Sequence, residues 1–253
     1  MTPVRTVGCR IEQRILVNVR VDPDVAARLL PTPLRPRLVG GAAIAGICLL
    51  WLAEIRPAGL PARFGLRSAN AAHRVAVEWD EGPEPHHGVF IPRSRHSDSA
   101  FTALAGGRLF PGVHERARLH RAAGADRVDV RLLGATEVTL TGSVADRLPP
   151  DSAFPDVDAA TAFFARDSTG WSAGRRPGTL EGVELVADRF ELAPLDVEVM
   201  HSTFFADVDR FPAGSTRFDS ALLMRPTAAT WRALTPWRLG SVAARDAAHE
   251  PCL

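Results

Sequence analysis

Residues Gly88–Arg116 read GVFIPRSRHSDSAFTALAGGRLFPGVHER, and this stretch holds the strongest architectural information in the chain. Its first residues, Gly88–Ile91, follow the alternating stretch His73–Trp79 across a loop rich in glycine, proline and histidine, which predicts a β-hairpin. Apolar residues then recur at helical spacing over Asp98–Leu104, and the pattern stops at Gly106–Gly107. The stretch therefore predicts a strand pair, a short helix and a glycine-rich turn in succession.

The rest of the chain continues this mixture of strands and few helices. Asp22 as N-cap and Pro23 at the first helical position predict a short helix over Val25–Leu30, and Asp156–Arg166 is the clearest helix, with Asp156 as its cap. The expected strands, some of which form hairpins, are Ile15–Val21, Ala42–Ile55 with a bend at Gly46, Val128–Leu133, Glu137–Leu140, Gly182–Val186, Phe190–Leu192, Val197–Phe204 and Ala221–Met224. Many short strands with few helices indicate an α+β domain built as a barrel or stacked sheets.

The glycine spacing resembles that of the acetoacetate decarboxylase-like superfamily. Gly106-Gly107-Arg108, followed four residues later by Gly112, matches the Gly-Gly-Arg and later glycine of that superfamily. In the decarboxylase the later glycine precedes Phe-Pro and two lysines, of which the first forms the Schiff base and the second depresses its pKa. Here the aligned residues are Val113, His114, Glu115 and Arg116.

Further segments support the resemblance, which covers roughly residues 10–235. They are Arg20–Pro23, Leu29–Pro31, Asn70–Arg74, Phe204–Phe205 and Phe218–Ala221. The resemblance implies a β-barrel or cone of mostly antiparallel strands with peripheral helices, and a cavity lined by the strands that contain Ala42–Ile55 and His73–Trp79. It also implies a homo-oligomer. We expect a single domain over residues 1–240 and a loose C-terminal tail over 241–253.

Composition excludes several classes of function. All 30 basic residues are arginine, so the chain has no lysine with which to form a Schiff base. A net charge of +1 gives no reason to expect a nucleic-acid partner. The longest apolar run, Ala42–Ala53, is too short for a membrane helix, and no secretory leader is recognisable. Three widely spaced cysteines, Cys9, Cys48 and Cys252, indicate reduced thiols and a cytoplasmic location.

The aligned segment supplies the candidate catalytic residues Glu115, His114 and Arg108. A carboxyl group in an apolar cone would have a pKa raised toward neutrality and would act as a general acid or base. Arg108 would hold a substrate carboxylate or stabilise an enolate. Two alternatives stay open: a shift of one residue would turn His114 inward in place of Glu115, or Glu115 and Arg116 are an ordinary solvated pair.

Candidate substrate-binding residues are Asn70, His73, Arg74, Arg116, Trp51, Phe110 and Phe204. Strand alternation separates Arg74 from His73, which shares its face with valines. A single histidine on such a face is more often a core residue, and the resemblance is what favours a place for it in the site. The aromatic residues are equally consistent with core packing.

We expect neither a metal nor a cofactor. The histidines lack a metal-ligand spacing, no G-x-S-x-G motif occurs, Cys48 has no nearby base in the sequence, and the glycines do not form a phosphate loop. The sequence thus predicts a cofactor-free acid–base enzyme, a lyase, cyclase or isomerase of biosynthesis, acting on a small or polyketide-like carbonyl or carboxylate substrate. Cyclisation, dehydration, isomerisation and decarboxylation are not separable. The alternative is a non-catalytic small-molecule binding module on the same scaffold.

Overall fold

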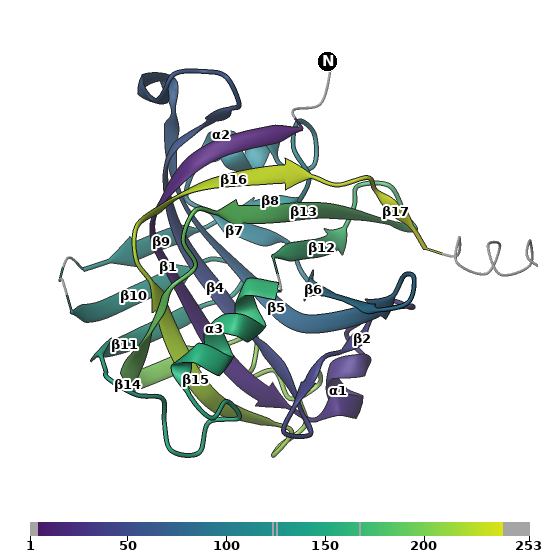
Figure 1. Cartoon of the computed structure of the whole chain (residues 1–253), viewed down its shortest axis with the longest axis vertical. Helices are drawn as coiled ribbons and strands as arrows, with labels where there is room; N and C mark the ends of the chain where they lie inside the picture. The colour runs from purple at the N-terminus through teal and green to yellow at the C-terminus, as the bar shows by residue number, and fades with distance from the viewer. Residues whose placement is uncertain (1–4, 123, 125, 167, 240–253) are drawn as a thin grey trace, which may run out of the picture.

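The computed structural model describes residues 5–122, 124, 126–166 and 168–239. The expected loose tail, 241–253, lies outside these residues. Three long antiparallel strands form the centre of the molecule (Figure 1): β1 (Thr6–Val21), β4 (Ala42–Pro57) and β5 (Leu66–Asp80). β4 lies between β1 and β5, so that Leu16 is opposite Cys48 and Cys48 opposite Ala72. The other elements build two walls around this central sheet.

The first wall closes a ring of seven strands. It consists of β6 (Pro85–Ile91), β12 (Thr169–Ala173), β13 (Thr179–Ala187) and β16 (Thr227–Ala233). The ring runs β1–β4–β5–β6–β12–β13–β16 and returns to β1, and every pairing except the parallel β6–β12 contact is antiparallel. This closed ring confirms the predicted barrel of mostly antiparallel strands.

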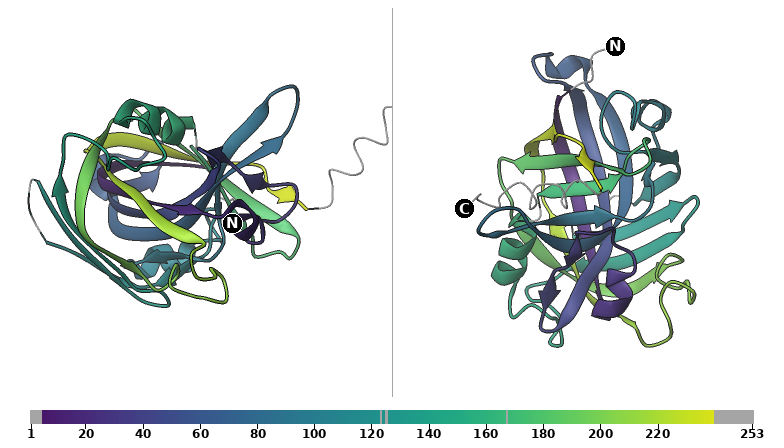
Figure 2. Two further views of the ribbon diagram at one scale, coloured as in Figure 1. Left: turned by 90° about the horizontal axis from the view of Figure 1, so that it is seen from below. Right: turned by 90° about the vertical axis from the view of Figure 1, so that its right-hand side faces the viewer.

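The second wall curves around the opposite face of the central sheet. On one side it pairs with β1 through β15 (Thr216–Met224), β14 (Leu192–Ser202), β11 (Val138–Val144), β10 (Arg127–Leu133) and β9 (Arg118–Arg121). On the other side, β7 (Arg95–Ser97) pairs with β5, and β8 (His114–Arg116) pairs in parallel with β7. Figure 2 shows this curvature from two further sides.

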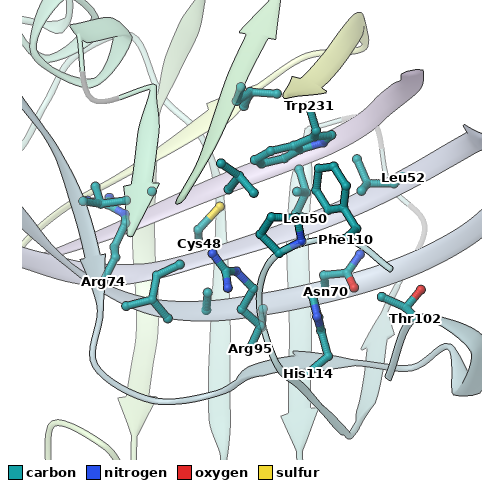
Figure 3. Close-up of a pocket in the computed structure, with 18 of the residues that line it drawn as sticks. Cys48, Leu50, Leu52, Asn70, Arg74, Arg95, Thr102, Phe110, His114 and Trp231 are labelled. Carbon is teal, nitrogen blue, oxygen red and sulfur yellow. The ribbon is translucent and has the colours of Figure 1, made fainter. Parts of the chain in front are cut away.

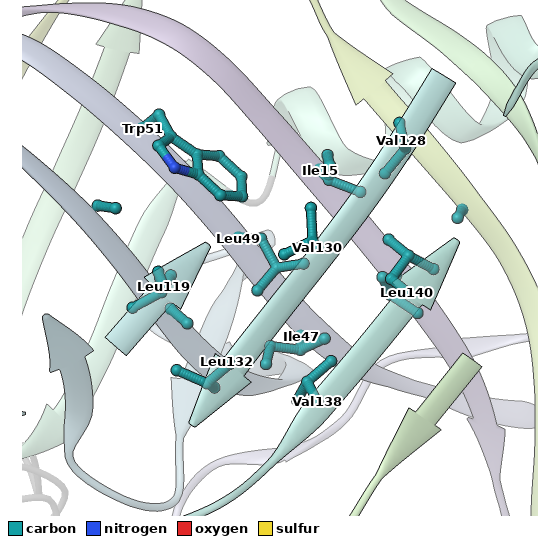
Figure 4. Packing of buried hydrophobic residues seen from close by; sticks show 14 of the residues in the cluster. Ile15, Ile47, Leu49, Trp51, Leu119, Val128, Val130, Leu132, Val138 and Leu140 are labelled. Carbon is teal, nitrogen blue, oxygen red and sulfur yellow. The ribbon is translucent and has the colours of Figure 1, made fainter. Parts of the chain in front are cut away.

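Alternation along the central strands divides their side chains between the two walls. On β4, Ile47, Leu49 and Trp51 face the second wall and pack in a hydrophobic core with Val130, Leu140 and other residues (Figure 4). Cys48 and Leu50, which alternate with them, face the ring. The apolar run Ala42–Ala53 is therefore a strand buried on both faces.

Helix α3 (Val157–Arg166) lies outside the strands, as the left view of Figure 2 shows. Asp156 caps it as predicted, with Oδ1 accepting from the N–H of Ala159 at 2.7 Å. Phe163 and Phe164 pack against Leu16, Ile44, Ala76 and Leu222, which close one end of the ring. None of the helices among the described residues is both long enough and apolar enough to cross a membrane.

The remaining elements are short, and some differ from the predicted bounds. They are α1 (Pro23–Ala27), β2 (Arg35–Pro36), β3 (Leu38–Val39), the 3₁₀ turn η1 (Ala62–Phe64), α2 (Ala100–Ala105) and β17 (Trp237–Arg238). Asp22 and Pro23 begin α1 as predicted, but the helix ends at Ala27 instead of Leu30. The predicted strand Phe190–Leu192 was wrong, because Phe190 lies outside any strand and β14 begins only at Leu192.

Candidate active-site cavity

A partly open cavity of about 200 Å³ lies on the Cys48 face of the central sheet, between the seven-strand ring and the segment that runs from β7 to β8 (Figure 3). This volume is below the roughly 300–1,000 Å³ of pockets that take drug-sized ligands, so the cavity fits a small molecule. The lining residues are Val7, Arg14, Cys48, Leu50, Leu52, Ile55, Asn70, Ala71, Ala72, Arg74, Val89, Ile91, Arg95, Thr102, Phe110, Pro111, His114, Ser168, Gly170, Val183, Leu185 and Trp231.

The lining is apolar with a basic component. Three arginines, Arg14, Arg74 and Arg95, and one histidine, His114, face the space, and none of the described lining residues is acidic. Figure 3 shows Arg95 and His114 on the side opposite Trp231, with Cys48 between Arg74 and Asn70. A cavity with this lining attracts anions, because its cationic groups are held in surroundings where water screens them little.

Arg95 reaches the cavity because β7 and β8 run in parallel, which puts it beside His114. Its Nη1 donates to Ser172 Oγ at 2.9 Å, while its Nη2 is buried and has no hydrogen-bond partner among the described residues. Burial lowers the pKa of Arg95 to about 10, and the nearby charge of Glu181 partly opposes that shift. The side chain is therefore a cation at neutral pH, with one N–H group available to a ligand.

His114 is held as a neutral imidazole with a defined tautomer. Its Nδ1 lies 3.0 Å from the carbonyl oxygen of Gly112, and because a carbonyl can only accept, Nδ1 carries the proton. Burial, reinforced by the charge of Arg95, lowers the pKa of His114 to about 3. Nε2 thus has a free lone pair, and no described residue donates a hydrogen bond to it. The ring is a proton acceptor beside a fixed cation.

The glycines of the Gly-Gly-Arg segment make room for these two side chains. A β-carbon on Gly106 would lie 2.6 Å from His114 Nδ1 and 2.6 Å from the carbonyl oxygen of Gly112. Gly112 itself has φ +99°, a conformation that favours glycine, and its N–H donates to Glu181 Oε2 at 2.9 Å. Glu181 on β13 therefore fixes the turn that orients both His114 and Arg95.

Four of the ten predicted site residues line the cavity, namely His114, Asn70, Arg74 and Phe110. Glu115, Arg116 and Arg108 are exposed and lie outside the lining. Arg108 donates to the carbonyl oxygen of Leu104 at 2.6 Å, and Arg116 to that of Asp98. The expectation that Glu115 faces the cavity is corrected. The carbonyl oxygen of Gly112 holds the His114 ring inward. Because successive side chains on a strand point in opposite directions, Glu115, the next residue on β8, points outward.

The other three predicted residues, His73, Trp51 and Phe204, face the second wall instead of the cavity. His73 stacks on Phe204 with ring centroids 4.2 Å apart, and its Nε2 lies 3.1 Å from Ser202 Oγ. Burial, reinforced by the charge of His96, lowers the pKa of His73 to about 3. Within the described part of the chain, no three His, Cys, Asp or Glu residues group as metal ligands.

Sequence reasoning did not identify the lining residues Arg14, Arg95, Thr102 and Trp231, and Cys48 was not among the predicted site residues. Arg95 lies within the stretch quoted first, but no strand was predicted there, and nothing in the sequence distinguishes it from the other arginines. Arg14 precedes Ile15–Val21 and was outside the predicted strand. The structure adds Arg14 because β1 begins at Thr6 and places it opposite Leu50.

Comparison with known proteins identifies the architecture. No protein-family model matches the sequence, and neither does any curated protein. Among solved structures, the enduracididine biosynthesis enzyme MppR in complex with pyruvate is 16% identical, with a TM-score of 0.60 over 96% of this chain and 93% of MppR. An acetoacetate decarboxylase-like enzyme from Sphingomonas wittichii RW1 is 14% identical, with a TM-score of 0.56 over 94% of each chain. Acetoacetate decarboxylase from Legionella pneumophila is 10% identical, with a TM-score of 0.58 over 93% of this chain and 89% of the other.

Proposed function

We propose that this chain, which has the acetoacetate decarboxylase-like fold, is an enzyme that moves a proton next to a carbonyl group of a small acidic substrate without a Schiff base. The observation that carries the proposal is the pair of Arg95 and His114 in one cavity, with a free N–H on the first and a free lone pair on the second. The fold neighbours support an enzyme on this scaffold, and MppR is described as a biosynthesis enzyme in complex with pyruvate, a small keto acid.

In the proposed chemistry Arg95 binds the carboxylate of the substrate with charge-assisted hydrogen bonds. His114 Nε2 takes the proton from the carbon next to the carbonyl. The electron pair of the broken C–H bond forms a C=C bond to the carbonyl carbon, and the π pair of the C=O bond moves onto the oxygen. The enolate oxygen that results is stabilised by the guanidinium of Arg95 and by the amide of Asn70. If His114 returns the proton to a different carbon, the result is an isomerisation. If the substrate has a β-hydroxyl group, the enolate re-forms the carbonyl, the C–O bond breaks, and the proton from His114 leaves with the hydroxyl as water, which is a dehydration.

The proposed proton transfer to His114 requires the negative charge of the substrate carboxylate. A free His114 with a pKa of about 3 is a weak base, and Arg95 opposes its protonation. A bound carboxylate compensates the charge of Arg95 and raises the pKa of His114 toward the range in which a base is effective. The site would therefore become basic only when an acid occupies it.

Hydrogen–deuterium exchange tests this function before the physiological substrate is known. The protein is incubated in D₂O with 2-oxobutanoate or 4-oxopentanoate, and exchange at the carbon next to the carbonyl is followed by NMR. We expect exchange above the buffer rate, and we expect His114→Gln to lower it by a factor of about 100 or more. Glu115→Gln, at the exposed neighbouring position, is the matched control and should leave the rate unchanged.

The alternative is a binding module on the same scaffold. The low pKa of His114 is the observation that favours it, because an unoccupied site of this kind holds no effective base. Saturable, Arg95-dependent binding of these acids without any exchange would establish the binding module and end the enzyme proposal.

A further inference from the structure

Arg14 is a second cation in the cavity that the proposed proton transfer does not use. It lies on β1, and its Nε donates to Cys48 Sγ at 3.3 Å. The guanidinium carbon is 5.7 Å from the centre of the Phe190 ring, and Leu50 is its cross-strand neighbour on β4. None of the described carboxylates lies within 4.0 Å of Arg14, unlike Arg10 on the same strand, which pairs with Glu12.

Arg95 shares this property with Arg14. Arg95 Nη1 donates to the neutral Ser172, and none of the described carboxylates lies within 4.0 Å of Arg95, although the charge of Glu181 acts on it from farther away. A charge held in a poorly hydrated cavity without a counter-charge is unfavourable, and proteins generally pair such groups. The third arginine of the lining, Arg74, donates to Asn18 Oδ1 and lies over the Phe164 ring. Arg14 and Arg95, in a cavity without acidic residues among its described lining, therefore offer two positions for negative groups of a ligand.

The strand register places the two arginines at opposite sides of the cavity floor. Arg14 on β1 is opposite Leu50 on β4, and Leu50 is opposite Asn70 on β5, a span of two strand spacings or about 10 Å. Arg95 enters from β7, beyond β5, where Ser97 pairs with Asn70. Cys48 and Ala72 form the floor between them. Arg14 extends over this floor as far as Cys48, to whose Sγ its Nε donates.

We propose that the ligand of this cavity is a short-chain dicarboxylate, with one carboxylate on Arg95 beside His114 and the second on Arg14. The proposal rests on the proposed function for the first carboxylate and adds the second. Apolar side chains of the lining, among them Leu50, Val89 and Val183, would contact the methylene groups between the two acids. The substrate class would then be keto dicarboxylic acids, whose carbonyl group lies near the end held by Arg95.

Pairs of acids that differ only in charge test the second carboxylate on the unmodified protein. Binding of succinate, glutarate and adipate is measured by isothermal titration calorimetry and compared with that of their half-amides, which have nearly the same size. We expect at least one diacid to bind at least tenfold more tightly than its half-amide, because a charge-assisted hydrogen bond is lost in the half-amide. Equal affinity across every pair would overturn the proposal.

Substitutions of the two arginines test which of them binds each carboxylate of the ligand. Arg14→Gln should reduce diacid affinity to that of the half-amide while leaving the half-amide unaffected, whereas Arg95→Gln should weaken both ligands. Arg14→Lys, which keeps the charge, should restore part of the preference, and Arg10→Gln, an exposed change on the same strand, should have no effect. If Arg14→Gln weakens half-amides and diacids equally, both arginines bind one carboxylate, and the dicarboxylate proposal is wrong while the proposed function stands. Loss of hydrogen exchange with intact diacid preference would remove the proposed function alone.

Discussion

Gly112 makes room for Arg95: a β-carbon built on Gly112 would lie 2.1 Å from Nη1 of Arg95. No side chain fits there unless the guanidinium moves, and at φ +99° any residue other than glycine is also strained. The glycine that first suggested the fold is therefore also the residue that allows a buried cation beside His114. The position links backbone geometry directly to the charge of the cavity.

We predict that Gly112→Ala lowers carboxylate affinity by a factor of ten or more, measured by calorimetry. The control is Gly59→Ala, because Gly59 has φ +91° but nothing within 4 Å of a built β-carbon. Both variants should lose about 1–2 kcal/mol of unfolding free energy from backbone strain, and only the first should lose binding. Unchanged affinity in Gly112→Ala would mean that Arg95 is not the anion-binding group.

Ligand binding should be coupled to proton uptake. A carboxylate bound to Arg95 should raise the pKa of His114 from about 3, so in mildly acidic solution the complex binds more protons than the free protein. We expect carboxylate affinity, corrected for ionisation of the ligand, to rise as the pH is lowered from 6 to 5. Calorimetry in buffers of different ionisation enthalpy gives the number of protons taken up, and His114→Gln should reduce it to the residual of other groups.

Stability should fall in mildly acidic solution. The folded-state pKa of both His73 and His114 is about 3, against 6.5 in a solvated chain. Above pH 6.5 neither state is protonated at these residues, and between pH 6.5 and 3 the unfolded chain binds protons that the folded chain does not. The free energy of unfolding should therefore decrease across this window, by at most about 1.4 kcal/mol per pH unit for each histidine.

Urea denaturation at a series of pH values measures this slope. His73→Gln should make it shallower by the contribution of one residue, whereas His120→Gln, at an exposed position, should leave it unchanged. An identical slope in wild type and His73→Gln would show that His73 is protonated in the folded state.

The buried carboxylate of Asp219 connects β15 of the second wall to the loop that precedes α3. Asp219 on β15 is 1% exposed and accepts from Ser152 Oγ at 3.0 Å, Ala153 N–H at 2.7 Å and Ser220 Oγ at 2.8 Å. Its Oδ1 also lies 3.2 Å from Arg20 Nε. We predict that Asp219→Ala lowers the free energy of unfolding by about 2–4 kcal/mol, because several donors lose their acceptor. Asp151→Ala, an exposed control, should cost less than about 1 kcal/mol.

The sequence predicted the barrel class because its strands alternate and its glycines are spaced as in one superfamily. Helix starts were equally predictable, since Asp22 and Asp156 carry their capping signal locally. The inward residue of the His114–Glu115 pair was not predictable, because it depends on where the turn at Gly112 delivers the chain. Arg14 and Arg95 were missed because the cavity they face is formed by strands that are distant in sequence. No local sequence pattern indicates which arginines will lack an acidic partner in the folded chain.

The pairing of β1 with β15 and β16 also determines when β1 can complete its hydrogen bonds during synthesis of the chain. Val21 is opposite Thr216, and Val7 is opposite Trp231, so the first strand to leave the ribosome waits for nearly the last. At translation rates of 5–20 residues per second, that delay is on the order of 10–40 s. During it, β1 can pair with β4 on one side, but its other edge stays unpaired, and an unpaired apolar strand edge is prone to association with other chains. Nascent chains of this protein are therefore expected to depend on chaperones, and truncation after β14 should yield aggregates instead of a smaller folded domain.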